Sequence, residues 1–155
     1  MKWLPTNDQK TLAVVDAKGS LTTFDLSETD VTLKQTQTLQ VTEKDSSVLL
    51  LSLDWFTSGS KIASSDSKGS VHVSKVSESN LSEDFSVTAH DFECWITCFD
   101  YENQSLVYSG GDDAKLKSYD TRINPASSPV FVCKEHMAGV TSLLSPAGGE
   151  LLSGR

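Results

Sequence analysis

The chain has 155 residues, with 13 Lys and Arg against 21 Asp and Glu, which gives a formal net charge of -8. A polyphosphate partner requires a basic face, so this charge argues against nucleic acid as the main partner. The longest apolar run, residues 48–51, is far shorter than the roughly 18 to 20 apolar residues of a membrane span. We therefore expect no membrane span and, because no apolar leader segment follows Met1, a cytoplasmic location.

Three cysteines, Cys94, Cys98 and Cys133, are an odd number in a chain without a secretion signal, which favours reduced thiols over a disulfide framework. Cys94 and Cys98 lie four residues apart but lack a second pair of ligands nearby. His72 and His136 are isolated too, without the spacing of a zinc motif. We expect neither a metal site nor a cofactor.

The predicted elements, taken in chain order, repeat one pattern. A hairpin is predicted over residues 12–26, where a β-rich run is followed by a polar turn with Asp, Lys and Gly and by alternating apolar and polar residues. An apolar strand over 48–55 then precedes a second hairpin over 62–76. A further strand over 95–101 precedes a third hairpin over 107–122. The same hairpin pattern therefore occurs three times.

The interval between the copies indicates the architecture. Registering Leu21, Val71 and Leu116 gives separations of about 50 and 45 residues, and residues 151–154 restart the pattern about 45 residues further on. Ser-rich stretches between copies, such as residues 77–84, predict exposed loops. Three or four short strands every ~40 to 50 residues, without helices between them, are typical of propeller blades. A β-sandwich is the alternative, although it would not require similar hairpins at a nearly constant interval.

The third copy resembles a WD40 repeat. Ala89-His90 stands where that family has a Gly-His pair, and Tyr119-Asp120 replaces the Trp-Asp dipeptide. The tyrosine is a departure, because it offers a hydroxyl where an indole N–H is usual. We therefore predict an all-β fold, a partial WD40-like β-propeller that forms a single domain over residues 1–155. Its repeat units are expected at approximately 1–40, 41–85, 86–133 and, truncated, 134–155.

The number of blades matters for closure. A closed propeller needs about four to eight blades, and this chain offers about three plus a truncated fourth. We therefore expect a fragment or a short isoform, whose open end leaves unpaired strands that could meet a partner.

Ser, His and Asp side chains in the third copy permit two interpretations. One is a catalytic triad, although no G-x-S-x-G elbow supports an α/β-hydrolase mechanism. The favoured one is the buried hydrogen-bond network of a WD40 blade, which satisfies polar groups that would otherwise cost roughly 1 to 3 kcal/mol each. The paired aspartates of the turn could act as general acid and base, but Asp at a β-turn accepts backbone N–H bonds. The expected network comprises His90, Ser109, Asp112, Asp113 and Tyr119.

The segment before the third hairpin carries an acid beside an indole. Glu93 lies two residues before Trp95, and a repeat blade does not require this pair. Together they could hold a cation through charge and π attraction. The alternative is a core tryptophan at the start of a strand and a solvated glutamate.

The order of the motifs resembles the WD-repeat diphthine methyl ester hydrolases, also called diphthine methyltransferases. The likeness runs from about Leu51 to Leu143 and more weakly back to Met1. It rests on residues 51–55, 64–67 with Gly69, Ala89-His90, Phe92-Glu93, Trp95-Ile96, 107–113, 120–122 and His136 with 137–140.

The resemblance implies a step in the synthesis of diphthamide, the modified histidine of translation elongation factor 2, which would be the protein substrate. Members of the family hydrolyse the methyl ester of methylated diphthine, releasing methanol and a free carboxylate. That substrate also carries a quaternary ammonium, for which Glu93 and Trp95 are the candidate binding residues.

Ester hydrolysis needs a water or nucleophile activated by a base. The candidate bases are His90 and His136, and the candidate carboxylates that orient them are Glu93 and Asp113. The alternative function is a non-catalytic WD40 scaffold whose rim binds peptides or other proteins, a role that repeats and composition alone would favour.

Overall fold

The computed structural model describes residues 1–6, 10–27, 29–43, 47–123 and 128–155, and the regular elements in these ranges are all β-strands. This confirms the all-β prediction for the described residues. None of them forms a helix of the length and apolar character that crossing a membrane requires. The strands are β1 (Lys2–Trp3), β2 (Thr11–Val15), β3 (Ser20–Leu26), β4 (Leu33–Gln40), β5 (Leu50–Trp55), β6 (Lys61–Asp66), β7 (Ser70–Val76), β8 (Leu81–Thr88), β9 (Cys94–Phe99), β10 (Leu106–Gly111), β11 (Leu116–Asp120), β12 (Phe131–Cys133), β13 (Ser142–Leu144) and β14 (Leu152–Gly154).

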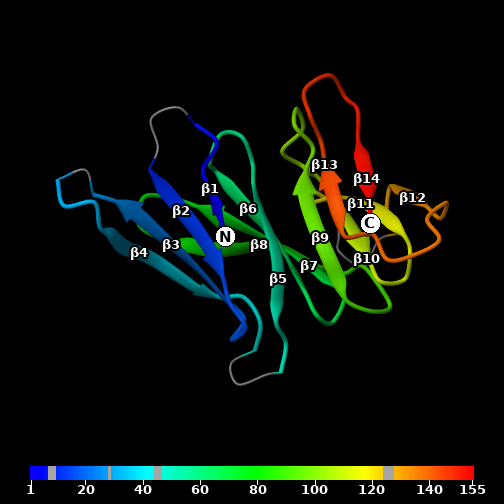
Figure 1. Ribbon diagram of the computed structural model, residues 1–155, viewed down its shortest axis with the longest axis horizontal. Coiled ribbons are helices and arrows are strands. Elements are labelled where there is room, and N and C mark those ends of the chain that lie inside the picture. Colours follow the sequence, from blue (N-terminus) through cyan, green and yellow to red (C-terminus); the bar gives the residue numbers. More distant parts are fainter. Residues whose placement is uncertain (7–9, 28, 44–46, 124–127) are drawn as a thin grey trace.

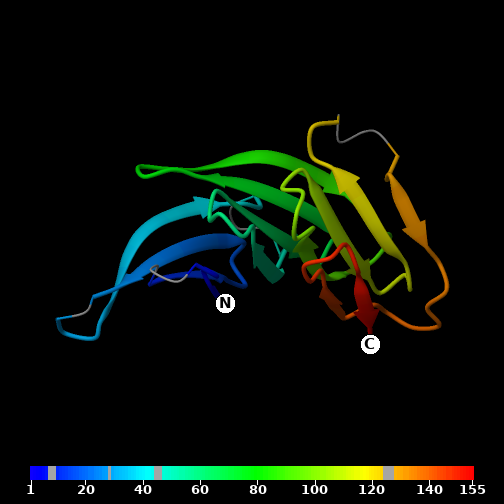
Figure 2. The same ribbon diagram turned by 90° about the horizontal axis from the view of Figure 1, so that it is seen from above.

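Within the described residues, three four-stranded sheets and one two-stranded hairpin follow one another along the chain (Figure 1). Strands β1 to β4, β5 to β8 and β9 to β12 form the three sheets in sequence order, and β13 pairs with β14. Figure 2 shows the sheets arranged around an arc, with both termini on its inner side. The first strands β1, β5, β9 and β13 contact one another in succession. They form the inner edge of a partial propeller.

The outer strand of the second sheet corrects the prediction of a loop over residues 77–84. Leu81 begins β8, which pairs with β7 from Val76↔Leu81 to Ser70↔Thr88. Leu81 and Phe85 are buried, whereas Glu83 between them is exposed. Leu81 packs towards the first sheet and Phe85 towards the third, while Ser82, Glu83 and Asp84 between them are at least partly exposed, so this outer strand has the polar composition of a loop.

The three hairpin turns share one backbone conformation. In the first two, the N–H of Gly19 donates to Asp16 O and the N–H of Gly69 donates to Asp66 O, each at 3.3 Å, and both glycines have positive φ (77° and 86°). In the third turn Ala114 takes the glycine position, with φ 57°, and its N–H donates to Gly111 O at 3.3 Å. A side chain is therefore held in the left-handed region that glycine adopts without penalty.

Two apolar clusters lie between successive sheets. The first includes Leu21 from the first sheet and Ile62 from the second. The second includes Ala63 from the second sheet and Val107 from the third. Consecutive residues of β6 thus face opposite clusters, as the period of a strand dictates. The second sheet is consequently buried on both faces.

Polar side chains also join the sheets at the inner edge. The Ser52 hydroxyl accepts the backbone N–H of Thr97 at 2.9 Å, and Asp54 Oδ2 accepts the N–H of Phe99 at 3.0 Å. These side chains of β5 satisfy backbone donors of β9 that face the neighbouring sheet. The relative position of the second and third sheets is therefore fixed by hydrogen bonds as well as by packing.

Candidate functional site

The loop between β8 and β9 carries the candidate residue His90 and packs against the β6–β7 turn. The N–H groups of Ala89 and His90 both donate to Gly69 O, at 2.8 and 2.9 Å. A Cβ placed on Gly69 would lie 2.3 Å from His90 O. Only glycine allows this approach, so the turn of the second sheet determines where the His90 loop lies.

His90 forms a buried network with two side chains of the third sheet. Its Nδ1 lies 2.8 Å from Asp113 Oδ1, and its Nε2 lies 2.9 Å from Ser109 Oγ. An ionised carboxylate only accepts, so Nδ1–H donates to Asp113 and Nε2 accepts the Ser109 hydroxyl. Both ring nitrogens are therefore engaged.

Burial and hydrogen bonding set the protonation of this pair. Burial lowers the pKa of His90 and outweighs the opposing effect of Asp113. Burial also opposes ionisation of Asp113, but hydrogen bonds from His90 and from the Lys115 N–H hold the pKa of this carboxyl below its usual range. The ring is neutral and only 3% of the residue is exposed. His90 thus positions the loop and has no nitrogen free for a substrate.

Two residues expected in the network lie beside it. The Tyr119 hydroxyl donates to Ala89 O at 3.4 Å, and Lys117 Nζ donates to the same carbonyl. Asp112 faces the other way, because its Oδ1 accepts the Trp95 indole N–H at 3.1 Å. In the described contacts the network thus comprises His90, Ser109 and Asp113, with Tyr119 bonded to the loop backbone.

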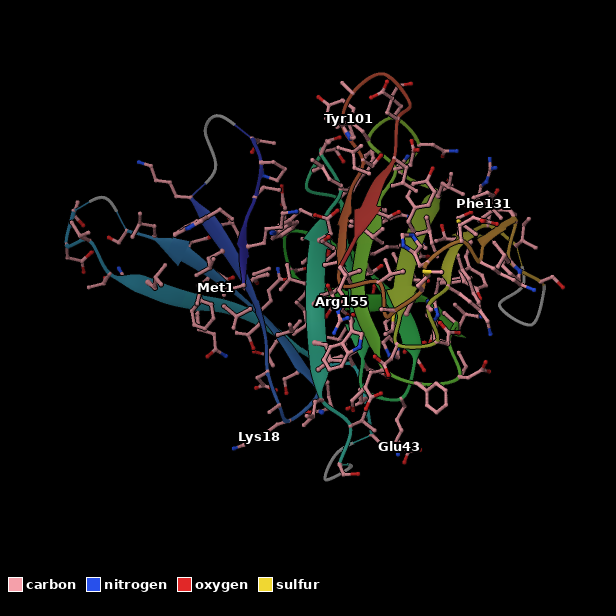
Figure 3. All side chains as sticks on the ribbon, turned by 45° about the vertical axis from the view of Figure 1, so that its right-hand side comes forward. Met1, Lys18, Glu43, Tyr101, Phe131 and Arg155 are labelled. Atoms are coloured by element: carbon pink, nitrogen blue, oxygen red, sulfur yellow. The ribbon has the colours of Figure 1, made fainter. Side chains whose placement is uncertain are left out.

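Trp95, Asp112 and Glu93 form a rim at one end of the third sheet. The indole of Trp95 is bonded to Asp112 and the residue is 39% exposed. Glu93 is half-buried, and its backbone carbonyl accepts the Asp112 N–H at 2.9 Å. Trp95 is thus a surface residue rather than part of the core. Figure 3 labels Lys18 and Glu43 at this end of the strands and Tyr101 at the opposite end.

The His136 loop reaches the same rim. A Cβ on Gly139 would lie 2.8 Å from Asp112 Oδ1, so this loop packs against the Asp112 turn. His136 Nε2 lies 3.0 Å from Ser153 Oγ, and the ring is half-buried. This pair repeats the His90–Ser109 contact in the next hairpin. No described hydrogen bond joins His136 to Glu93 or Asp113.

A second Asp-His-Ser chain, which the sequence reasoning missed, lies in the second sheet. His72 Nε2 lies 3.0 Å from Asp66 Oδ2, and Ser86 Oγ lies 3.0 Å from His72 Nδ1. Burial opposes ionisation of Asp66, but hydrogen bonds from His72 and from the turn backbone lower its pKa. Asp66 and His72 flank the same predicted turn, so folding that hairpin on itself would have indicated the first contact. The second contact depends on the register with β8.

Two of the three cysteines have the character of core residues. Cys94 and Cys98 are buried, and burial raises the pKa of each thiol to about 12. A protonated, enclosed thiol is a weak nucleophile and a weak ligand. Among the described residues, no group of three His, Cys, Asp or Glu side chains is placed to hold a metal ion.

The chain is similar in sequence to curated proteins named diphthine methyltransferase. The mouse protein is 39% identical over 94% of this chain, the human protein 37% over 94%, and the fission yeast Schizosaccharomyces pombe protein 37% over 94%. The chain belongs to the diphthine methyltransferase family. It spans 32%, 34% and 43% of the length of these three family members. No protein-family model matches the chain.

A solved structure supports the fold. A chain of the crystal structure of the mitotic checkpoint complex superposes with a TM-score of 0.75, covering 99% of this chain and 42% of that one, at 19% sequence identity. At this identity the likeness concerns the fold alone. Together with the arc of four-stranded sheets, it confirms the prediction of a partial WD40-like propeller.

Proposed function

We propose that this chain takes part in diphthamide synthesis by hydrolysing the methyl ester of methylated diphthine on translation elongation factor 2. The observation that carries the proposal is the 37% to 39% identity to diphthine methyltransferases, which extends over 94% of the chain. This identity is about twice the 19% of the solved structure with which the chain shares the fold alone, which favours a shared role over a shared blade scaffold. On this proposal, the part of the relatives that this chain does not span also contributes to the activity.

The rim supplies groups suited to one part of that substrate. Methylated diphthine carries a quaternary ammonium, which is attracted to an aromatic face and to negative charge. Trp95 offers a partly exposed indole whose orientation is fixed by Asp112. The Asp112 carboxylate lies against the indole, and the backbone of Glu93, a second acidic residue, is bonded to Asp112. We assign this rim to recognition of the ammonium.

Of the two candidate bases, His136 is the one suited to contact a substrate. His90 is enclosed and both of its nitrogens are bonded, whereas the His136 ring is half-buried and lies in a loop that packs on the rim. As a base it would take a proton from water as the water oxygen adds to the ester carbonyl. The leaving methoxide would then receive that proton and depart as methanol. Asp113 positions His90, and Glu93 contributes charge at the rim.

A non-catalytic scaffold is the second candidate function. It is favoured by the enclosed side chains of His90, Ser109 and Asp113, whose hydrogen bonds hold the loop and whose polar groups are not exposed. On this alternative the Trp95 rim binds an unmodified peptide segment and no ester is cleaved.

The test uses the protein at the full length of its relatives, mixed with elongation factor 2 that carries methylated diphthine. Hydrolysis removes one methylene from the substrate mass, whereas a scaffold binds and leaves the mass unchanged. We expect Glu93→Gln and Trp95→Ala to raise KM, and His136→Asn to lower kcat. Trp3→Ala is the matched control, because Trp3 is exposed on β1 in the first sheet. Unchanged turnover in the Glu93 and Trp95 variants would show that the rim is not the ammonium site.

A further inference from the structure

Phe92 carries an exposed aromatic ring beside the Trp95 rim. It lies in the loop between β8 and β9, one residue before Glu93, and 60% of it is exposed. This loop joins the second sheet to the third, and both sheets are described with all four of their strands. The exposure of Phe92 therefore does not arise at an open end of the arc. Two aromatic side chains, Phe92 and Trp95, thus face solvent at one rim.

The backbone that carries Phe92 is held on both sides. A Cβ on Gly69 would lie 2.5 Å from Phe92 O, so the loop packs closely on the turn of the second sheet. One residue further on, Glu93 O accepts the Asp112 N–H from the turn of the third sheet at 2.9 Å. An exposed ring on a fixed backbone has only two side-chain torsions to lose when a partner covers it. Aromatic side chains are enriched in protein interfaces, and this one is already positioned for an interface.

The charge around Phe92 is predominantly negative. The loop and the two turns that hold it comprise residues 66–69, 89–95 and 111–115. Their acidic residues outnumber their lysines, with Asp66, Asp91, Glu93, Asp112 and Asp113 against Lys68 and Lys115. The charge complement of this surface is a basic segment of a partner.

Two acidic groups of this surface remain available to a partner. Lys115 is already paired, with Nζ 3.0 Å from Asp91 Oδ2 and 3.4 Å from Asp113 Oδ2. Asp112 Oδ1 accepts the Trp95 indole N–H, but no described hydrogen bond or ion pair engages its Oδ2 or the Glu93 carboxylate. These two carboxylates flank the aromatic pair in sequence and in the fold.

The spacing of the two rings matches that of neighbouring residues in one extended segment. Phe92 and Trp95 are three residues apart, so their Cα atoms are separated by at most about 10 Å. An extended polypeptide advances about 3.3 Å per residue. A segment that places one side chain at Trp95 therefore brings a residue two or three positions away over Phe92.

We infer that Phe92 docks the polypeptide on either side of the residue whose ammonium lies at Trp95. This inference rests on the proposed function and adds the part of the substrate that the rim recognises. An apolar side chain of the protein substrate covers the phenyl ring, and basic residues next to it meet the charge of Glu93 and Asp112. The rim accordingly selects methylated diphthine within a polypeptide over the same residue in isolation.

The experiment compares two substrates of the protein at the full length of its relatives. One is elongation factor 2 that carries methylated diphthine, and the other is methylated diphthine with blocked amino and carboxyl groups; methanol release measures both. We expect Phe92→Ser to lower kcat/KM about tenfold on the protein substrate, through KM, and to leave the blocked amino acid unaffected. Phe92→Leu should retain most of the activity on the protein substrate. Between about 0.05 and 0.3 M salt, KM should rise more steeply for the protein substrate.

Tyr101→Ser is the matched control, because Tyr101 is an exposed aromatic residue at the opposite end of the strands (Figure 3). Thermal unfolding shows whether each variant is folded. Wild-type protein that cleaves neither substrate would overturn the proposed function and this inference with it. Cleavage that Phe92→Ser leaves unchanged, or lowers equally on both substrates, would overturn the inference alone, as would an equal loss in Tyr101→Ser. The same salt dependence for both substrates would overturn the basic part of the inference.

Discussion

Ser64 and Ser109 occupy the same place, the fourth residue of β6 and of β10, and both are fully buried. The Ser109 hydroxyl donates to His90 Nε2 at 2.9 Å, whereas the Ser64 hydroxyl has no hydrogen-bond partner among the described residues. A buried hydroxyl stabilises only when it is bonded. Two chemically identical side chains in equivalent positions therefore contribute differently.

We predict opposite effects for the two alanine substitutions. Ser109→Ala leaves His90 Nε2 without a donor and should lower the free energy of unfolding by about 1 to 3 kcal/mol. Ser64→Ala removes an unbonded hydroxyl and should leave the stability unchanged or raise it. Urea unfolding followed by fluorescence measures both. A loss of stability in Ser64→Ala as large as that in Ser109→Ala would contradict the difference in hydrogen bonding between the two serines.

The buried His90 predicts a pH dependence of stability. Its pKa is lowered from 6.5 in the folded state by burial, so as the pH falls below 6.5 the unfolded chain takes up a proton that the folded chain does not. The free energy of unfolding should therefore fall from about pH 7.5 towards about pH 5. The lowered pKa values of Asp66 and Asp113 add a separate loss only as the pH falls below about 4.

His90→Gln isolates this contribution. The variant is less stable than wild type at neutral pH because the bond to Asp113 is lost, and its stability should change less between about pH 7.5 and pH 5. Urea unfolding at a series of pH values gives both curves. Parallel curves would show that another group titrates in this window.

At the scale of elements, the three turns differ in how well their sequences suit the shared backbone. Ala114 holds φ 57°, where a non-glycine residue costs roughly 1 to 2 kcal/mol. Glycine removes this cost but makes the unfolded chain more flexible, which takes back about 0.4 to 1 kcal/mol. We predict that Ala114→Gly raises the free energy of unfolding by about 0.5 to 1 kcal/mol, as measured by thermal and urea unfolding.

Gly69→Ala is the reciprocal change. It places a Cβ at positive φ and 2.3 Å from His90 O, so the loss should exceed about 1 to 2 kcal/mol. The loop that carries His90 would shift together with the Gly69 turn. A stabilising Gly69→Ala would be inconsistent with this description of the turn, as would an Ala114→Gly change that destabilises.

The hairpins could be predicted from sequence because their information is local. Alternation in 62–76 and the Asp-Ser-Lys-Gly turn lie within a few residues of each other. The start of strand β8 was not predicted, because pairing with β7 makes it a strand while its polar residues are typical of a loop. Within the site, His90, Ser109 and Asp113 followed from a repeat pattern. The Trp95–Asp112 bond joins residues 17 apart through the register of β9 with β10, which no local pattern indicates.

At the scale of the whole molecule, the second sheet is the only one of the described sheets that contributes to both apolar clusters as the middle layer. Ile62 faces the first cluster and Val73 the second, and neither is exposed. The β13–β14 hairpin has no such cover, because Leu144 and Leu152 are largely exposed. Backbone hydrogen bonds should therefore open least often in the second sheet and most often in the hairpin.

Amide hydrogen exchange tests this order and also the coupling between the sheets. We expect amides of β6 and β7 to exchange at least about 100-fold more slowly than those of β13 and β14, which corresponds to roughly 3 kcal/mol in opening free energy. Ile62→Val removes one methylene from the first cluster and should cost about 0.5 to 1.5 kcal/mol. If the three sheets open as one unit, the same loss appears at Val107 in the third sheet, although this residue packs in the other cluster. A loss confined to the first two sheets would mean that each interface between sheets opens independently, and the shared middle sheet would then not transmit stability along the arc.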